Sequence, residues 1–201
     1  MTSEPIRDPA ADHLITPANA VLLVIDYQPV QVQSVASMER RAMVENATAV
    51  ARAAKLFGMP VVLSTVNVKA GGDPTIPLLR TALADVEEID RTTINAWEDV
   101  EFVRAVKATG RKKLVMAALW TEACLTFPSL DALREGFEVY PIVDAVGGTS
   151  PEAHRAGLER IVRAGAQPTS VIQLLCELQR DWSRAATADK FAEIAFGVLG
   201  R

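Results

Sequence analysis

The chain has 201 residues, a formal net charge of −4 and an apolar fraction of 49%. That is enough apolar side chain to form a sizeable core, so the composition excludes an intrinsically disordered protein. The mild acidity and the absence of a basic run argue against binding to nucleic acid or to an anionic membrane surface, since both need clustered Lys and Arg. We therefore expect one globular domain over residues 1–201.

The few cysteines and histidines bound the possible chemistry. Cys124 and Cys176 are too few for a disulfide scaffold, and the first 20 residues lack the apolar core of a signal peptide. We therefore expect a cytoplasmic protein with reduced thiols and no membrane-spanning segment. The only histidines are His13 and His154, which argues against a His-rich metal site. The chemistry of an enzyme would then fall on a carboxylate, a thiol or a cation, with no metal and no cofactor.

Short β-branched runs alternate with longer helical patterns along the chain. The first 19 residues show neither pattern, and we interpret them as an arm that is mobile or docked on a neighbouring subunit. In chain order we expect strands at 21–26, 60–65, 86–90, 113–119, 137–143 and 168–170, helices at 39–57, 78–83, 98–109, 122–135, 150–164, 171–183 and 190–199, and an irregular loop at 67–79. Apolar strands separated by helices predict a parallel sheet covered on both faces, which is a three-layer α/β/α fold.

Ligands of open parallel sheets bind beyond the carboxyl ends of the strands, and Cys124 is placed there. It follows the most apolar strand, in the segment 120–124 (WTEAC). If Thr121 caps the helix that begins there, Cys124 lies in the first turn. Unpaired backbone N–H groups and the helix dipole would favour a thiolate at that position and could stabilise an oxyanion. The alternative is a small buried apolar residue, as most free cysteines are.

Two charged residues follow other strands at the same edge. Asp26 ends the first apolar strand, where it could act as a base. Arg91 follows the third strand, where it could pair with Asp26 and hold a thiolate or an anionic substrate. The alternatives are a strand-end or capping carboxylate and a solvated surface arginine. We interpret Cys176 as packing on an apolar helix face, and His154 as a structural histidine.

Several segments occur in an order that is typical of a known family: 21–28 (VLLVIDYQ), 94–97 (INAW), 120–124 (WTEAC), 143–145 (VDA) and 177–182 (ELQRDW). In this order the chain resembles the isochorismatase-like (cysteine hydrolase) superfamily, and most closely its YcaC-like branch. The resemblance covers roughly residues 14–185. It implies a six-stranded parallel sheet in the α/β/α fold and a homo-oligomer of two to eight subunits.

The resemblance also implies a catalytic Asp–Lys–Cys triad. Asp26 matches the family's aspartate and Cys124 its nucleophile, while Arg91 stands nearest to the position of the lysine. Arginine cannot carry a proton, so its implied role is to stabilise the thiolate and orient Asp26. A non-proline cis peptide is implied between Trp120 and Thr121. Nicotinamidases of the superfamily carry a histidine metal site after the second strand, but residues 65–69 (TVNVK) contain no histidine, so we do not expect a metal-dependent nicotinamidase.

The combined hypothesis is a cysteine-dependent hydrolase that cleaves a small amide or related C–N substrate through a thioester acyl-enzyme. The oxyanion site and substrate pocket are expected to include Trp120, Thr121, Asn95, Trp97 and Gln28. One alternative is an isochorismatase-type hydrolase that cleaves a vinyl ether without the thiol. The other is a ligand-binding or thiol-sensing protein without turnover.

Overall fold

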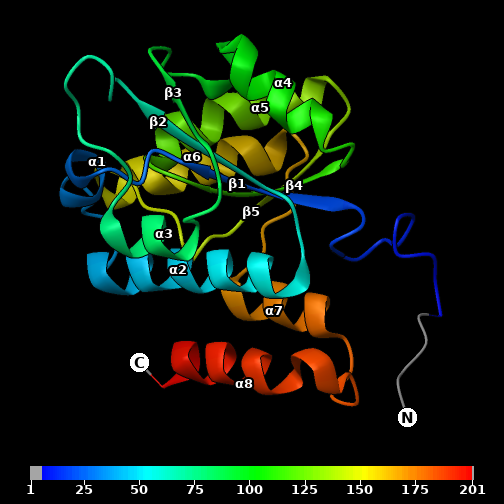
Figure 1. Ribbon diagram of the computed structural model, residues 1–201. Coiled ribbons are helices and arrows are strands. Elements are labelled where there is room, and N and C mark those ends of the chain that lie inside the picture. The colour runs from blue at the N-terminus through cyan, green and yellow to red at the C-terminus, as the bar shows by residue number, and fades with distance from the viewer. Residues whose placement is uncertain (1–5, 201) are drawn as a thin grey trace.

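The computed structural model describes residues 6–200, which form a parallel sheet between two layers of helices (Figure 1). The sheet order is β3-β2-β1-β4-β5, and every pairing between neighbours is parallel. The strands are β1 (Ala20–Ile25), β2 (Val61–Val66), β3 (Glu88–Arg91), β4 (Lys113–Ala118) and β5 (Glu138–Pro141). The predicted α/β/α fold is confirmed. The expected strand at 168–170 is reduced to one parallel bridge between Thr169 and Ile142.

Helices cover both faces of the sheet, and β1 is therefore buried on both sides (Figure 1). Leu22 and Val24 belong to one apolar core, and Leu23 and Ile25 belong to the other, as the alternation of side chains along a strand requires. The first core packs on α2 (Arg40–Phe57), α3 (Pro77–Ala82), α7 (Val171–Gln179) and α8 (Ala185–Leu199), and the second on α4 (Val100–Ala108), α5 (Thr126–Arg134) and α6 (Pro151–Arg163). Within residues 6–200, no helix is both long enough and apolar enough to cross a membrane.

Residues with clear local preferences set several helix ends. α2 ends at Gly58, whose φ of 69° lies in the left-handed region that favours glycine. α6 begins where the Ser150 hydroxyl accepts a hydrogen bond from the N–H of Ala153, with Pro151 in the first turn. The sequence did not predict α1 (Pro29–Gln33) or the 3-10 turn η1 (Ala96–Glu98), because such short elements show no periodicity.

The expected arm contacts its own chain over residues 6–19, and its docking on a neighbouring subunit stays a prediction. Lys113 is almost fully buried, and its Nζ donates to the carbonyl oxygens of Asp12 at 2.9 Å and Leu14 at 3.2 Å. Arg180, just after α7, binds the Asp12 carboxylate at 3.2 Å. A buried ammonium needs such acceptors, which explains why the arm lies against the start of β4. Residues 1–5 of the arm lie outside the described residues.

Candidate active site

Asp26 lies directly beyond β1 at the carboxyl edge of the sheet. Its side chain is fully buried, and its N–H donates to the Ser64 carbonyl at 2.9 Å. Its φ of 61° lies in the left-handed region, which Asp tolerates better than most residues. A buried carboxylate on a strained backbone is typical of a functional position.

Arg91 ends β3 and reaches across to Asp26. Its Nη2 donates to Asp26 Oδ2 at 2.6 Å, and both side chains are 0% exposed. The strand register explains the meeting, since Ser64 pairs with Ile25 and Val66 pairs with Arg91, which places Arg91 just beyond the level of Asp26. The interpretation of Arg91 as a solvated surface residue is therefore wrong.

Cys124 lies in η2 (Thr121–Leu125), a single π-helical turn between β4 and α5. The expected helix at 122–135 is thus divided into η2 and α5. Pro128 has no N–H to donate to the Cys124 carbonyl, so a regular helix cannot continue through this point. Isolated π turns occur frequently at functional sites.

The Cys124 thiol lies beside Asp26 and is 7% exposed. Burial raises the pKa of the thiol to about 12, and the charge of Asp26 and a hydrogen bond to it act in the same direction. Arg91 and the backbone N–H of Trp120 lower the pKa of the thiol. Burial also raises the pKa of the Asp26 carboxyl, while Arg91 lowers it. A thiol and a carboxylate with raised pKa values, both beside one cation, are suited to exchanging a proton.

Buried polar atoms without a nitrogen or oxygen partner gather at this edge of the sheet. In the described part of the chain they are Asp26 Oδ1, Gln31 Oε1, Arg91 Nε and Nη1, Thr93 Oγ1 and Glu122 Oε2, and each follows or ends β1, β3 or β4. Buried polar groups are normally paired, so this edge is where a substrate or water would complete the structure. Sequence reasoning did not single out Gln31, Thr93 or Glu122, and their position after a strand was the only available signal.

Trp120 and Thr121 begin the turn that carries Cys124. The cis peptide joins Leu119 to Trp120, so its expected position between Trp120 and Thr121 is wrong by one residue; β4 ends at Ala118 and the chain turns at once. The Thr121 N–H donates to the Gly147 carbonyl at 2.9 Å and is therefore occupied. The indole Nε1 of Trp120 donates to the Gln31 carbonyl at 3.0 Å.

The other three expected pocket residues direct their polar groups elsewhere. Asn95 Nδ2 donates to Asp131 at 2.7 Å, and Trp97 Nε1 donates to Glu135 at 2.8 Å, so both are bound to α5. Gln28 is buried and bonds the backbone of β2 through both ends of its amide. A role for these three residues in the substrate pocket stays a prediction.

Cys176 and His154 are both interpreted as structural residues from the sequence, and the structure places them differently. Cys176 is exposed, so its interpretation as a packing residue is wrong. The buried face of α7 carries Leu174 and Leu178, and position 176 lies about 200° round the helix from 174. His154 is half-buried, and its Nδ1 lies 2.8 Å from Thr121 Oγ1.

Comparison with known proteins decides the family. The isochorismatase domain model matches residues 20–173. The chain belongs to the isochorismatase family. It is 36% identical over 165 residues to the probable hydrolase YcaC of Escherichia coli (strain K12), a match that covers 82% of this chain and 79% of the relative.

Solved structures of this isochorismatase family support the YcaC-like branch. The E. coli YcaC structure, described as an octameric hydrolase of unknown specificity, has a TM-score of 0.86 at 32% identity and covers 98% of this chain and 96% of its own. YcaC from Pseudomonas aeruginosa, solved with hexane-2,5-diol and covalent acrylamide, has a TM-score of 0.81 at 31% identity, with 94% and 98% covered. The resemblance drawn from the residues is confirmed, and the chain is an isochorismatase-family hydrolase.

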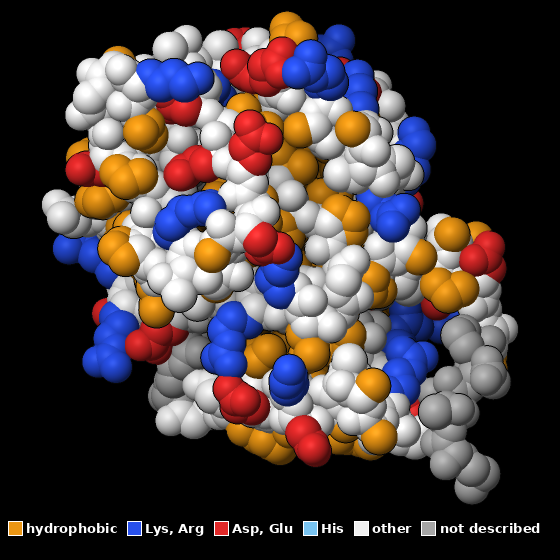
Figure 2. Space-filling model, viewed as in Figure 1, with side chains coloured by type: hydrophobic (Ala, Val, Ile, Leu, Met, Phe, Trp, Pro, Cys, Tyr) orange, Lys and Arg blue, Asp and Glu red, His pale blue; other side chains and the backbone are white. Residues whose placement is uncertain are grey.

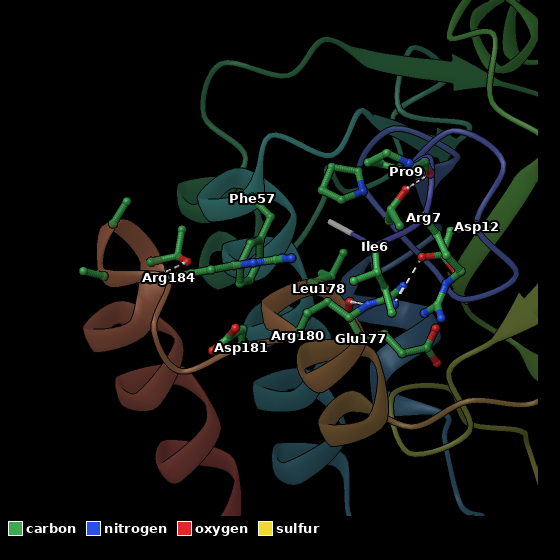
Figure 3. A pocket seen from close by; sticks show the side chains of 15 residues that line it. Ile6, Arg7, Pro9, Asp12, Phe57, Glu177, Leu178, Arg180, Asp181 and Arg184 are labelled. Atoms are coloured by element: carbon green, nitrogen blue, oxygen red, sulfur yellow. Dashed lines mark hydrogen bonds and ion pairs between the residues drawn. The ribbon is translucent and has the colours of Figure 1, made fainter. Parts of the chain in front are cut away.

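A cavity in this isochorismatase-family hydrolase lies at the opposite edge of the sheet. The cavity of about 790 Å³ is lined by the arm, the end of α7 and the start of α8 (Figure 3). Arg7 and Arg180 lie on its wall, but both bind Asp12, at 3.1 and 3.2 Å. None of the unpartnered buried atoms lines this cavity. Residues 6–200 also contain no group of three His, Cys, Asp or Glu that could hold a metal ion. The carboxyl edge of the sheet is therefore the candidate active site.

Proposed function

We propose that this hydrolase cleaves a small amide or related C–N substrate, with Cys124 as nucleophile and Asp26 as proton carrier. The observation that supports the proposal is the buried meeting of a thiol, a carboxylate and a guanidinium at the carboxyl edge of the sheet. Oδ1 of Asp26 has no nitrogen or oxygen partner, so it is available to the thiol proton.

The first half of the reaction forms a thioester. Asp26 accepts the proton of the Cys124 thiol, and the sulfur attacks the substrate carbonyl carbon to form a C–S bond. The Cys124 backbone N–H is proposed to donate to the resulting oxyanion, since the Thr121 N–H is occupied. Asp26 then passes its proton to the substrate nitrogen, the C–N bond breaks, and the amine leaves.

The second half regenerates the enzyme. Asp26 takes a proton from a water molecule as the water oxygen attacks the thioester carbon. The C–S bond breaks, the carboxylic acid product leaves, and the proton returns from Asp26 to the Cys124 sulfur. One carboxylate therefore serves both half-reactions, and no imidazole is needed.

Arg91 supports this cycle without transferring a proton, because a guanidinium stays charged at any working pH. It lowers the pKa of both Asp26 and Cys124, so a negative charge is stabilised on either side of the transfer. The charge can thus move from carboxylate to sulfur beside a fixed cation in a buried site.

The proposal is tested by exposing the protein to a panel of small amides and measuring its intact mass, with the adduct mapped by peptide sequencing. We expect an acyl adduct on Cys124. Because a YcaC structure contains covalent acrylamide, acrylamide is a suitable first reagent for the reactivity of the thiol. Oxidation of Cys124 without any acyl adduct would instead favour a thiol sensor. Turnover that survives Cys124→Ser but is lost in Asp26→Asn would favour a vinyl-ether hydrolase.

We also propose that the protein self-associates, as its octameric E. coli relative does. Trp182, Phe196 and Leu199 are 65%, 61% and 61% exposed, and they lie on or just before α8. Figure 2 shows hydrophobic side chains along the lower margin of the view, where α8 lies in Figure 1. Exposed apolar groups of this kind favour a protein interface. Light scattering during size-exclusion chromatography should show a multiple of 21.7 kDa, and a monomer at every concentration would contradict it.

A further inference from the structure

The start of α6 packs directly against the turn that carries Cys124. Two glycines allow this close approach. A Cβ at Gly157 would lie 3.1 Å from the Thr121 carbonyl oxygen, and a Cβ at Gly148 would lie 2.6 Å from Glu122 Oε2. The backbone of α6 at Gly157 therefore lies directly against the backbone of η2, and the loop before α6 lies against the Glu122 side chain.

Hydrogen bonds fix the contact at Thr121, which is fully buried. Its N–H donates to the Gly147 carbonyl at 2.9 Å, and its carbonyl accepts from Thr126 Oγ1 at 2.6 Å. Its hydroxyl lies 2.8 Å from His154 Nδ1 on α6. The contact with His154 joins two side chains, and it links η2 to a separate helix, α6.

The same turn sets the surroundings of the Cys124 sulfur. The N–H of Trp120, which directly precedes Thr121, lowers the pKa of the Cys124 thiol. The Leu125 N–H also returns to the Trp120 carbonyl at 3.2 Å, which closes the turn around Cys124. A shift of Thr121 would therefore move the peptide groups that face the sulfur.

We infer that His154 is a positioning residue for Cys124, which holds the nucleophile turn in place through the Thr121 hydroxyl. The inference rests on the proposed function of Cys124. Burial lowers the pKa of His154, whereas Glu122 on η2 raises it. The lowered pKa favours the neutral imidazole, and its Nδ1 shares a hydrogen bond with the Thr121 hydroxyl in either tautomer, as donor or as acceptor.

Two isosteric variants separate positioning from simple packing. His154→Asn keeps a polar atom near the place of Nδ1, whereas His154→Gln places its amide near Nε2. We would measure the rate of Cys124 alkylation by iodoacetamide from pH 7 to 10, in a Cys176→Ser background that removes the exposed second thiol. His154→Gln should slow alkylation about 2- to 12-fold at every pH in this range, which is the effect of one net hydrogen bond. His154→Asn should stay within about twofold of the parent.

A double-mutant cycle tests whether the effect passes through Thr121. Thr121→Val removes the hydroxyl at nearly constant volume and should reproduce the His154→Gln defect. The double variant should be no slower than either single variant, because both remove the same bond. Arg155→Gln, an exposed change at the next position of α6, should leave the rate unchanged.

The outcomes separate the two hypotheses. Equal rates in His154→Asn and His154→Gln, or defects that multiply in the double variant, would overturn the role of His154. If the parent Cys124 resists alkylation and Cys124→Ala keeps full turnover, the proposed function fails instead. Thermal melting of each variant shows whether its fold is retained. If His154→Gln is less stable, the comparison of His154→Asn with the parent still tests the role of the Nδ1 position.

Discussion

Removing Arg91 while Asp26 stays in place should strongly destabilise the fold. Both side chains are 0% exposed and joined at 2.6 Å, so Arg91→Met leaves a buried carboxylate without its cation. Breaking one side of a buried ion pair typically costs about 3–5 kcal/mol of unfolding free energy. For a chain of this size, the melting temperature should fall by roughly 6–20 °C. The loss should shrink as the pH falls, because protonation of Asp26 removes the unpaired charge.

Urea denaturation at pH 7 measures this free energy, and an exposed ion pair provides the control. Arg52 binds Glu193 with side chains 50% and 64% exposed, so Arg52→Met should cost less than about 1 kcal/mol. Adding Asp26→Asn to Arg91→Met should recover at least half of the lost stability, since the pair is then neutral. An Arg91→Met protein no less stable than Arg52→Met would refute the assignment of a buried ion pair.

Three further changes probe the site and its surroundings. Asp26→Asn should lower the pKa of the Cys124 thiol, because the charge of Asp26 and its hydrogen bond raise it, yet should abolish amide turnover; an unchanged alkylation–pH profile would count against this. The pKa of Cys124 is about 12 in the folded protein and about 8.5 in the unfolded chain, so the unfolding free energy should fall as the pH rises between these values. Cys124→Ser should show a shallower fall, and identical curves of unfolding free energy against pH for the two proteins would contradict this prediction. Gly148→Ala places a Cβ 2.9 Å from the His154 backbone nitrogen, which cannot move aside as a side chain can, and should cost about 1–3 kcal/mol by thermal melting. Gly197→Ala meets nothing within 4 Å and should be neutral or stabilising.

The sequence predicted the sheet well where burial alone decides the structure. β1 and β4 are buried on both faces, so their unbroken apolar runs gave clear strands. The segment at 168–170 failed as a strand because Pro168 has no N–H for a ladder, and a single bridge at Thr169 remains.

Side-chain direction was harder to predict than position. Asp26 and Cys124 follow strands and Arg91 ends one, all in one parallel sheet, so the carboxyl-edge rule placed them together. Asn95 and Trp97 lie near the same edge, but the carboxylates of α5 hold their polar groups. The packing of one helix on another turn decides such contacts, and residue spacing does not contain that information.

The same limit applies to the contact between α6 and η2. His154 and Thr121 are 33 positions apart, and each alone has an ordinary structural interpretation. Their meeting depends on how closely α6 approaches, which Gly157 permits. A lone histidine early in a helix therefore gave no signal of its contact with the turn that carries Cys124.

Turnover of an amide substrate by Cys124→Ala tests the central claim most directly. If Cys124 forms the thioester, the variant should lose at least about a thousandfold in kcat, the scale expected when an enzyme nucleophile is removed. The acyl adduct should also disappear from the intact-mass spectrum. A Cys124→Ala protein that retains full turnover would contradict the account.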